Sequence, residues 1–250
     1  MMLVMFFSTS TTLLTNFLTT ILRVDSSHTY SLYVWLLPGY LLGAFICFWW
    51  FRWQRWRFRF LIAGGMACFA FFFGYLYFFL SPDTTYEMLY LPIFIRGLGM
   101  LTLIIAFALF VVEDLNPKFL LMNAFFLITF RSVLAPIMAT SFYSNTLYRL
   151  EQKYMHSLVE TVTMADPLAA SRYGESFGAA LAGGHSYGDA VQMATYSLNT
   201  TLQQQALLLS LKEMLGVLFV VALVIAVISR FIPFHKTLRV TFARTGDDMV

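Results

Sequence analysis

Four arginines within eight residues interrupt two long apolar runs, and they constrain this chain more than any other feature. The junction between the runs 30–51 and 58–80 contains Arg52, Arg55, Arg57 and Arg59. An arginine at the centre of a bilayer costs about 2.5 kcal/mol or more on insertion scales. We therefore expect the loop 52–57 to stay on the cytoplasmic side, which fixes the side of every other loop.

Basic residues mixed with aromatic ones are also typical of nucleic-acid binding. The flanking runs, however, have transmembrane length. The interleaved tryptophans suit the headgroup layer, where one side of the ring is apolar and the other is wet. We expect no nucleic-acid partner.

The composition indicates an all-α integral membrane protein. The chain is 59% hydrophobic and 12% charged, whereas soluble domains are about 45–50% apolar and about 25% charged. A spanning helix needs about 20 mostly apolar residues. Six segments qualify, which predicts a six-helix bundle in the lipid bilayer: 1–22, 30–51, 58–80, 87–112, 118–145 and 206–232.

Alternation of the loops then predicts the topology. The segments 23–29, 81–86 and 146–205 lie outside, and 52–57 and 113–117 lie inside. The last segment, 233–250, follows Arg230 and carries three more basic residues, which fits the positive-inside bias independently. Both termini are expected to be cytoplasmic. The chain divides into helices one to five (1–145), an outside hairpin (146–205), the last span (206–232) and a cytoplasmic tail (233–250).

The first span carries a polar stripe at helical spacing, formed by Thr9, Thr12, Asn16 and Thr19. Two interpretations stay open. The hydroxyls can bond to their own backbone and to neighbouring helices. Alternatively, the stripe lines a wet cavity, because lipid does not favour the Asn16 amide.

Glycines in the second and fourth spans indicate close helix packing. Gly39 and Gly43 form a small-xxx-small pair, and Pro38 beside them is expected to kink the span. The fourth span contains Arg96-Gly97-Leu98-Gly99, where the glycines should admit a close neighbour.

Two arginines lie well inside predicted spans. Arg96 is about ten residues into the fourth span, and Arg131 is near the middle of the fifth, which also contains Asn123. Ionisable residues at such depth are candidates for function. The competing interpretation is a structural clamp onto carbonyl groups freed by Pro136 or Pro92.

The outside segment 146–205 has helical signals. Asp166-Pro167 is typical of a helix start, Gly183-Gly184 of a helix end, and Ser186 to Asp189 of a second start. We expect a helical hairpin. Its histidines lack metal-ligand spacing, and the chain has no catalytic motif. We therefore predict no metal, no cofactor and no enzyme activity.

The assembled features resemble the C-terminal half of a fourteen-helix drug:proton antiporter of the major facilitator superfamily, in the EmrB/QacA-like multidrug efflux branch. The resemblance covers nearly the whole chain. Its order of motifs is Pro38-Gly39, Gly43, the arginine cluster, Gly64-Gly65, Arg96-Gly97-Leu98-Gly99, Asn123, Arg131-Ser132 and Gln203-Gln204-Gln205-Ala206. Two departures stand out: Phe51 replaces the acid expected before Arg52, and Ser132 to Pro136 replaces a glycine-rich stretch.

The resemblance implies one bundle of a secondary transporter that exports lipophilic small molecules, in a bacterial inner membrane. An N-terminal half of six to eight helices would supply the second wall and the proton-carrying acid, and a periplasmic adaptor protein is a further implied partner. The expected substrate or proton pathway is Thr12, Asn16, Arg96, Asn123 and Arg131, with a cytoplasmic gating loop of Arg52, Arg55 and Arg57. The alternatives are a non-transporting scaffold or regulatory subunit that binds a partner through 146–205, and a small homodimeric permease.

Overall fold

A computed structural model of the chain describes residues 2–24, 26–53, 58–82, 84–113, 120–161 and 167–231. Within these ranges the chain is helical and contains no strand. The longer helices are α4 (Leu36–Trp53), α5 (Phe58–Phe79), α6 (Tyr90–Glu113), α8 (Ala135–Thr161), α9 (Pro167–Ala182) and α10 (Tyr187–Phe231). The shorter ones are α1 (Met2–Ser8), α2 (Thr11–Asn16), α3 (Ser26–Tyr33) and α7 (Leu120–Thr129).

Five helical stretches in the described ranges are long and apolar enough to cross a membrane: 30–52, 58–79, 86–110, 124–160 and 187–231. They correspond to five of the six expected spans. The expected span 1–22 is different, because it is broken at Thr9–Ser10 into α1 and α2, with a π-helical turn at Phe17–Ile21. A six-span bundle therefore stays a prediction.

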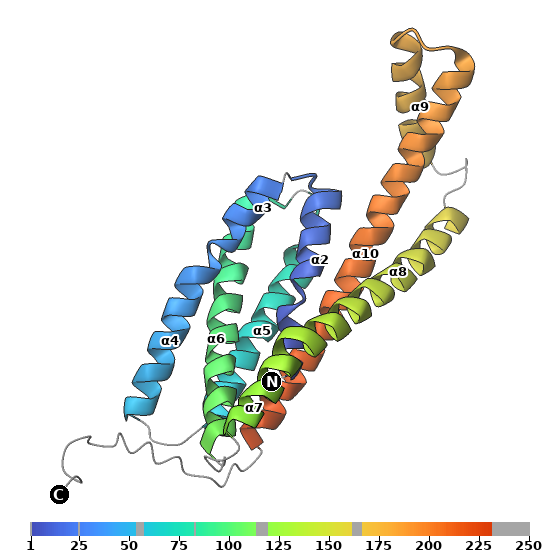
Figure 1. The fold of residues 1–250 in the computed structure, drawn as a ribbon. Helices are drawn as coiled ribbons and strands as arrows, with labels where there is room; N and C mark the ends of the chain where they lie inside the picture. Colours follow the sequence, from blue (N-terminus) through green and yellow to red (C-terminus); the bar gives the residue numbers. More distant parts are fainter. Residues whose placement is uncertain are drawn as a thin grey trace, which may run out of the picture.

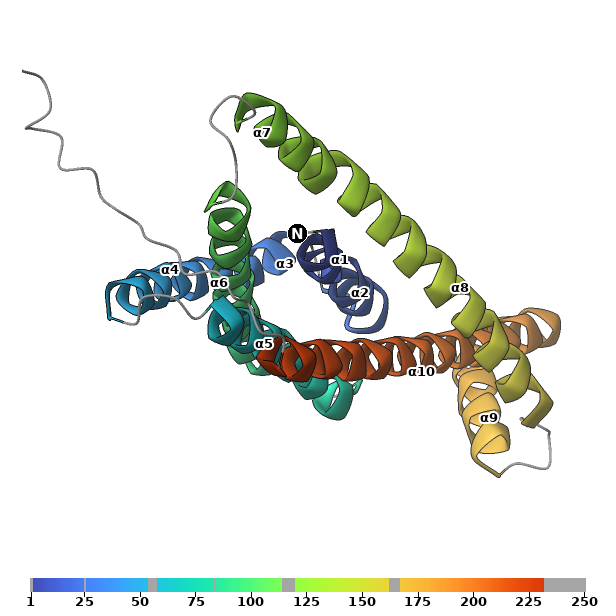
Figure 2. The ribbon, with the colours of Figure 1, turned by 90° about the horizontal axis from the view of Figure 1, so that it is seen from below.

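Four helices form a row in the order α4, α6, α5, α10, and α1 and α2 lie against one side of it (Figure 2). The helix α8 packs on α1 and crosses α10 (Figure 1). Between them the core is rich in phenylalanine. Phe7 of α1 lies 5.8 Å from Phe69 and 5.6 Å from Phe73 of α5, measured between ring centres.

The glycine predictions are confirmed at the α4–α6 contact. A Cβ atom added at Gly39 would collide with the carbonyl oxygen of Phe94, and one at Gly97 would lie 2.8 Å from that of Leu36. The other side of α6 approaches α5 as closely, since a Cβ atom at Gly99 would lie 2.9 Å from the carbonyl oxygen of Gly65. The helix that carries Arg96 is thus held between two neighbours at backbone distance.

The kink expected at Pro38 is found about one turn earlier. The second span is interrupted at Val34–Trp35, between α3 and α4, and Pro38 lies in the first turn of α4. A proline ring clashes with the carbonyl four residues back, and the first helical turn needs no proline N–H. The interruption removes the clash and keeps Pro38 inside the helix.

The helix boundaries predicted for the hairpin are confirmed, whereas its place outside the membrane stays a prediction. The helix α9 begins at Pro167 and ends before Gly183, and Gly184 adopts a φ of +83°, a conformation that glycine accepts readily. The hydroxyl of Ser186 accepts a hydrogen bond from the Asp189 amide at 3.3 Å, which caps α10. The boundaries predicted at 145/146 and 205/206 lie inside α8 and α10, which continue through them without a break.

The start of α5, which follows the arginine cluster, lies beside the end of α10, which precedes the tail. The guanidinium carbons of Arg59 and Arg230 lie 5.3 Å and 4.1 Å from the centre of the Phe60 ring. At the opposite end, the hydroxyls of Ser31 and Tyr86 are 2.9 Å apart. This matches the expected alternation of loops (Figure 1). Which end is cytoplasmic stays a prediction, and the tail 233–250 lies outside the described residues.

Candidate functional site

The break in the first span follows from its hydroxyl-bearing residues. The hydroxyls of Ser8 and Thr9 both donate to the carbonyl of Met5 at 2.8 Å, and Ser10 donates to Phe7 at 2.7 Å. Such bonds compete with the helical backbone pattern. The amides of Ser10 and Thr12 bond to the carbonyls three residues back, on Phe7 and Thr9. The carbonyls of Phe6 and Ser8 thereby lose their usual amide donors.

Two side chains from other helices donate hydrogen bonds to these two carbonyl groups. Tyr143 of α8 donates its hydroxyl to the Phe6 carbonyl at 2.9 Å, and Nη2 of Arg96 on α6 donates to the Ser8 carbonyl. Both residues are buried, with exposures of 1% and 2%. Irregular backbone at membrane depth is tolerated where it is enclosed by protein or lines a cavity. Arg96 and Tyr143 supply that enclosure here.

Arg96 is not fully satisfied. Its Nε and Nη1 atoms are buried and make no hydrogen bond to any group in the described ranges. The guanidinium carbon lies 5.4 Å from the centre of the Phe72 ring. The ion pairs found in the described chain lie elsewhere. A buried cation therefore has an aromatic neighbour but no described carboxylate.

An apolar cavity of about 460 Å³ adjoins the same turn of α1. It lies between α1, α8 and α10, and its lining includes Phe6, Phe7, Met138, Phe142, Val217 and Val221. The rings of Phe6 and Phe142 are 5.2 Å apart. The volume is within the range of small-molecule sites, about 300–1,000 Å³. Arg96 is not among the residues that line the cavity; the two features are neighbours at α1, where Phe7 lines the cavity and Ser8 accepts the bond from Arg96.

The polar stripe of the first span combines features of both interpretations. Thr12, Thr15 and Thr19 donate to carbonyls of their own helix at 3.0, 3.0 and 2.9 Å. Thr15 also meets the Tyr33 hydroxyl at 2.9 Å. An open pocket of about 400 Å³ is nevertheless lined by Thr12, exposed Asn16 and Tyr33, among others. The hydroxyls follow the backbone-bonding interpretation, and a pathway along Thr12 and Asn16 stays a prediction.

Arg131 does not join Arg96. It lies in a π-helical turn, η4 (Phe130–Leu134), directly before α8 and Pro136, and its side chain is half-buried. The described residues offer it neither a hydrogen bond nor an ion pair, so a clamp onto carbonyls near Pro136 is not seen. Asn123 lies on α7, and its side-chain environment is not described.

The structure describes one of the three arginines of the predicted gating loop. Arg52 lies exposed in the last turn of α4, and Arg55 and Arg57 lie outside the described residues. Their predicted role is untested.

Sequence reasoning missed Tyr143. The residues Ala135, Ala139, Tyr143 and Leu147 recur every four positions and are all buried. That spacing, which places the phenol on the same helix face as Ala135 and Ala139, was the available signal for an inward-facing side chain.

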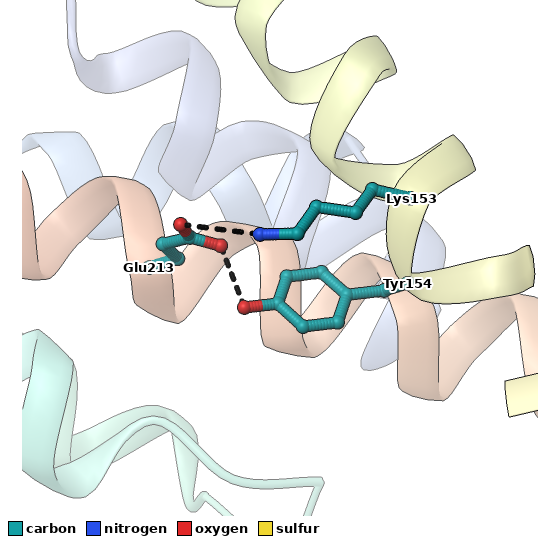
Figure 3. A network of polar contacts seen from close by, with 3 residues as sticks. All are labelled: Lys153, Tyr154 and Glu213. Atoms are coloured by element: carbon teal, nitrogen blue, oxygen red, sulfur yellow. Dashed lines mark hydrogen bonds and ion pairs between the residues drawn. The ribbon is translucent and has the colours of Figure 1, made fainter. Parts of the chain in front are cut away.

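A second polar network joins α8 to α10 nearer the hairpin (Figure 3). The Tyr154 hydroxyl donates to Glu213 Oε2 at 2.6 Å, and Lys153 Nζ lies 3.9 Å from Glu213 Oε1. The Lys153 and Glu213 side chains are 65% and 36% exposed. Water therefore competes for these groups, and the network ties the two long helices together near their crossing.

Comparisons with protein-family models, curated proteins and solved structures found no match to this chain. The described residues also contain no group of three potential metal ligands. The assignment to a transporter family accordingly stays a prediction based on the motifs.

Proposed function

We propose that the chain is one helical bundle of a secondary active transporter that exports lipophilic small molecules by proton antiport. The observation that carries the proposal is the broken first span with Arg96 buried at the break. Discontinuous membrane helices form the binding sites of many secondary transporters, near the midplane and between repeats. A cation buried there at a cost of several kcal/mol is favoured by selection for function more than for stability.

The proposal requires a second bundle. Proton coupling needs a carboxylate in the membrane. Among the described residues, Glu87 and Glu213 lie near the ends of their apolar segments, and Glu113 is the last residue of α6. In this proposal an N-terminal half contributes the proton-carrying acid and the opposite wall. A periplasmic adaptor at the hairpin end completes the export path in a double-membrane bacterium.

Dye efflux tests the proposal. The full chain, co-expressed with a matching N-terminal bundle in a drug-sensitive host, should lower the accumulation of a lipophilic dye. Arg96→Met should abolish the effect, whereas Arg172→Met, at an exposed position on α9, should leave it unchanged. Unchanged dye accumulation with correctly inserted wild-type chain would remove the support for a transporter.

A scaffold role is the second candidate, favoured by the hairpin. The helix α9 packs on the first part of α10 and projects beyond the membrane bundle (Figure 1). A cross-linking pull-down from membranes, through residues placed on α9, should recover a specific partner if this role holds. A chain with normal efflux and no partner would exclude it.

A further inference from the structure

The hydrogen-bonding capacity of Arg96 exceeds what the protein supplies. A guanidinium carries five N–H donors in a planar fork. Nη2 bonds to the Ser8 carbonyl, while Nε and Nη1 are buried without a partner. Leaving buried charged donors unpaired is costly, and an Arg fork matches a carboxylate with two parallel hydrogen bonds. The missing partner is therefore an anionic group, and a carboxylate suits it best.

The surroundings describe the rest of such a ligand. Phe6 and Phe7 line the cavity of about 460 Å³, and Ser8, the next residue, holds Arg96 through its carbonyl. The cavity walls are apolar along α8 and α10 as well, at Met138, Phe142 and Val217. Arg96 itself does not line the cavity, and its free donors are buried. A ligand joins the two features when α1 shifts, so that its charged head lies at Arg96 and its apolar part among these side chains. Neither a small inorganic ion nor a lipophilic cation satisfies both features.

We propose that Arg96 binds the carboxylate of an amphipathic organic acid whose apolar part occupies the cavity between α1, α8 and α10. This inference rests on the proposed function, since it names the substrate class for the same site. Arg96 is 2% exposed, so the acid reaches it when α1 moves at the Thr9–Ser10 break. This movement would break the hydrogen bonds that the carbonyls of Phe6 and Ser8 accept from Tyr143 and Arg96.

Ligand binding by the full chain in lipid nanodiscs tests the proposal. Three probes share one alkyl chain and differ in the head: dodecanoate, dodecanamide and dodecyltrimethylammonium. Displacement of a fluorescent lipophilic reporter gives each affinity. Dodecanoate should bind about tenfold or more tightly than dodecanamide, as a charge-assisted fork implies. Equal binding of the two, tighter binding of the cation, or no binding of any probe would overturn the proposal.

Variants of the protein separate the contribution of the probe's head group from that of its alkyl chain. Arg96→Met should remove the preference for dodecanoate and keep the affinity for dodecanamide. Arg96→Lys, which retains the charge and loses the fork, should keep part of the preference and serves if Arg96→Met does not fold. Val221→Phe, which fills the cavity away from the break, should weaken both probes by a similar factor. Arg172→Met, which removes an exposed charge on α9, is the matched control and should change neither affinity.

Failure of this inference differs from failure of the proposed function. If dye efflux is present but dodecanoate has no advantage, the transporter stands and the acid site is wrong. If dodecanoate binds through Arg96 but no substrate is exported, the acid site stands and the transporter is wrong.

Discussion

The two arginines inside predicted spans occupy opposite environments. Arg96 lies on α6 and is enclosed between α1 and α5. The helices next to α6 approach it to backbone distance at Gly39, Gly97 and Gly99. Arg131 lies on a helix that faces outward over most of its surface: the side chains of Phe125 and Ile137, on either side of it, are 66% and 61% exposed.

The residues that flank each arginine explain why one is enclosed and the other is not. Depth in a span is similar for both residues in the sequence, but glycines flank one, and bulky side chains flank the other. Small residues let neighbouring helices close around Arg96 and exclude water. Around Arg131 the bulky residues Phe130, Val133 and Leu134 are themselves exposed, so no neighbouring helix of the described chain encloses its charge.

The strongest way to break the Arg96 environment is to separate α4 from α6. Gly39→Ala would push a methyl group into the Phe94 carbonyl oxygen, and backbone cannot yield as a side chain can. We expect a loss of about 3 kcal/mol in the free energy of unfolding. Denaturation in mixed micelles measures it. The matched control is Gly64→Ala on α5, where no atom lies within 4 Å of the new Cβ; it should gain up to about 1 kcal/mol.

Replacing each arginine by methionine should affect stability in different ways. Arg96→Met removes a buried charge with two unpaired donors, and the Ser8 carbonyl keeps the Thr11 hydroxyl at 3.2 Å. We expect the free energy of unfolding to rise by about 1 kcal/mol while export is lost. Arg131→Met should change it by less than about 0.5 kcal/mol. A drop of similar size for Arg96→Met would instead identify a structural clamp.

Tyr143→Phe tests the second contact at the break. The ring packing is retained, but the Phe6 carbonyl loses its hydroxyl donor in a buried site. We expect a loss of about 1 kcal/mol. Thermal unfolding in detergent should detect it. Tyr148→Phe, at an exposed position on the same helix, should have no measurable effect; equal losses for both would mean that the Phe6 bond adds nothing.

Lys153→Ala should have the smallest effect, about 0.5 kcal/mol or less, because its ion pair with Glu213 is largely exposed. Added salt screens exposed pairs. The difference between wild type and variant should therefore vanish in high salt. A difference that persists there would indicate that Lys153 contributes by packing rather than by charge.

Much of the fold could be predicted, because its determinants are local. Apolar length identified five spans, and Pro167, Gly183 and Ser186 identified the ends of the hairpin helices. The first span was predicted as one helix because hydropathy counts apolar residues and ignores hydroxyls that compete for backbone carbonyls. The break at Thr9–Ser10 depends on that competition and on partners from α6 and α8.

The candidate site could be predicted in part. Arg96 was identified by its charge inside an apolar run, since that conflict is visible in one segment. Its contacts with Ser8 and Phe72, and the role of Tyr143, depend on which helices meet, and nothing local specifies this. For Arg131 the same rule predicted a site, which stays a prediction; the structure places it in a π-helical turn among exposed side chains.

The unbroken course of α10 has a mechanical consequence. Its 45 residues form a rod of roughly 67 Å, more than twice the hydrocarbon thickness of about 30 Å. A tilt of about 10° around its membrane end would sweep the far tip, with α9 attached, through roughly 12 Å. A small tilt of α10 at its membrane end would therefore become a large displacement of α9, as in a lever arm.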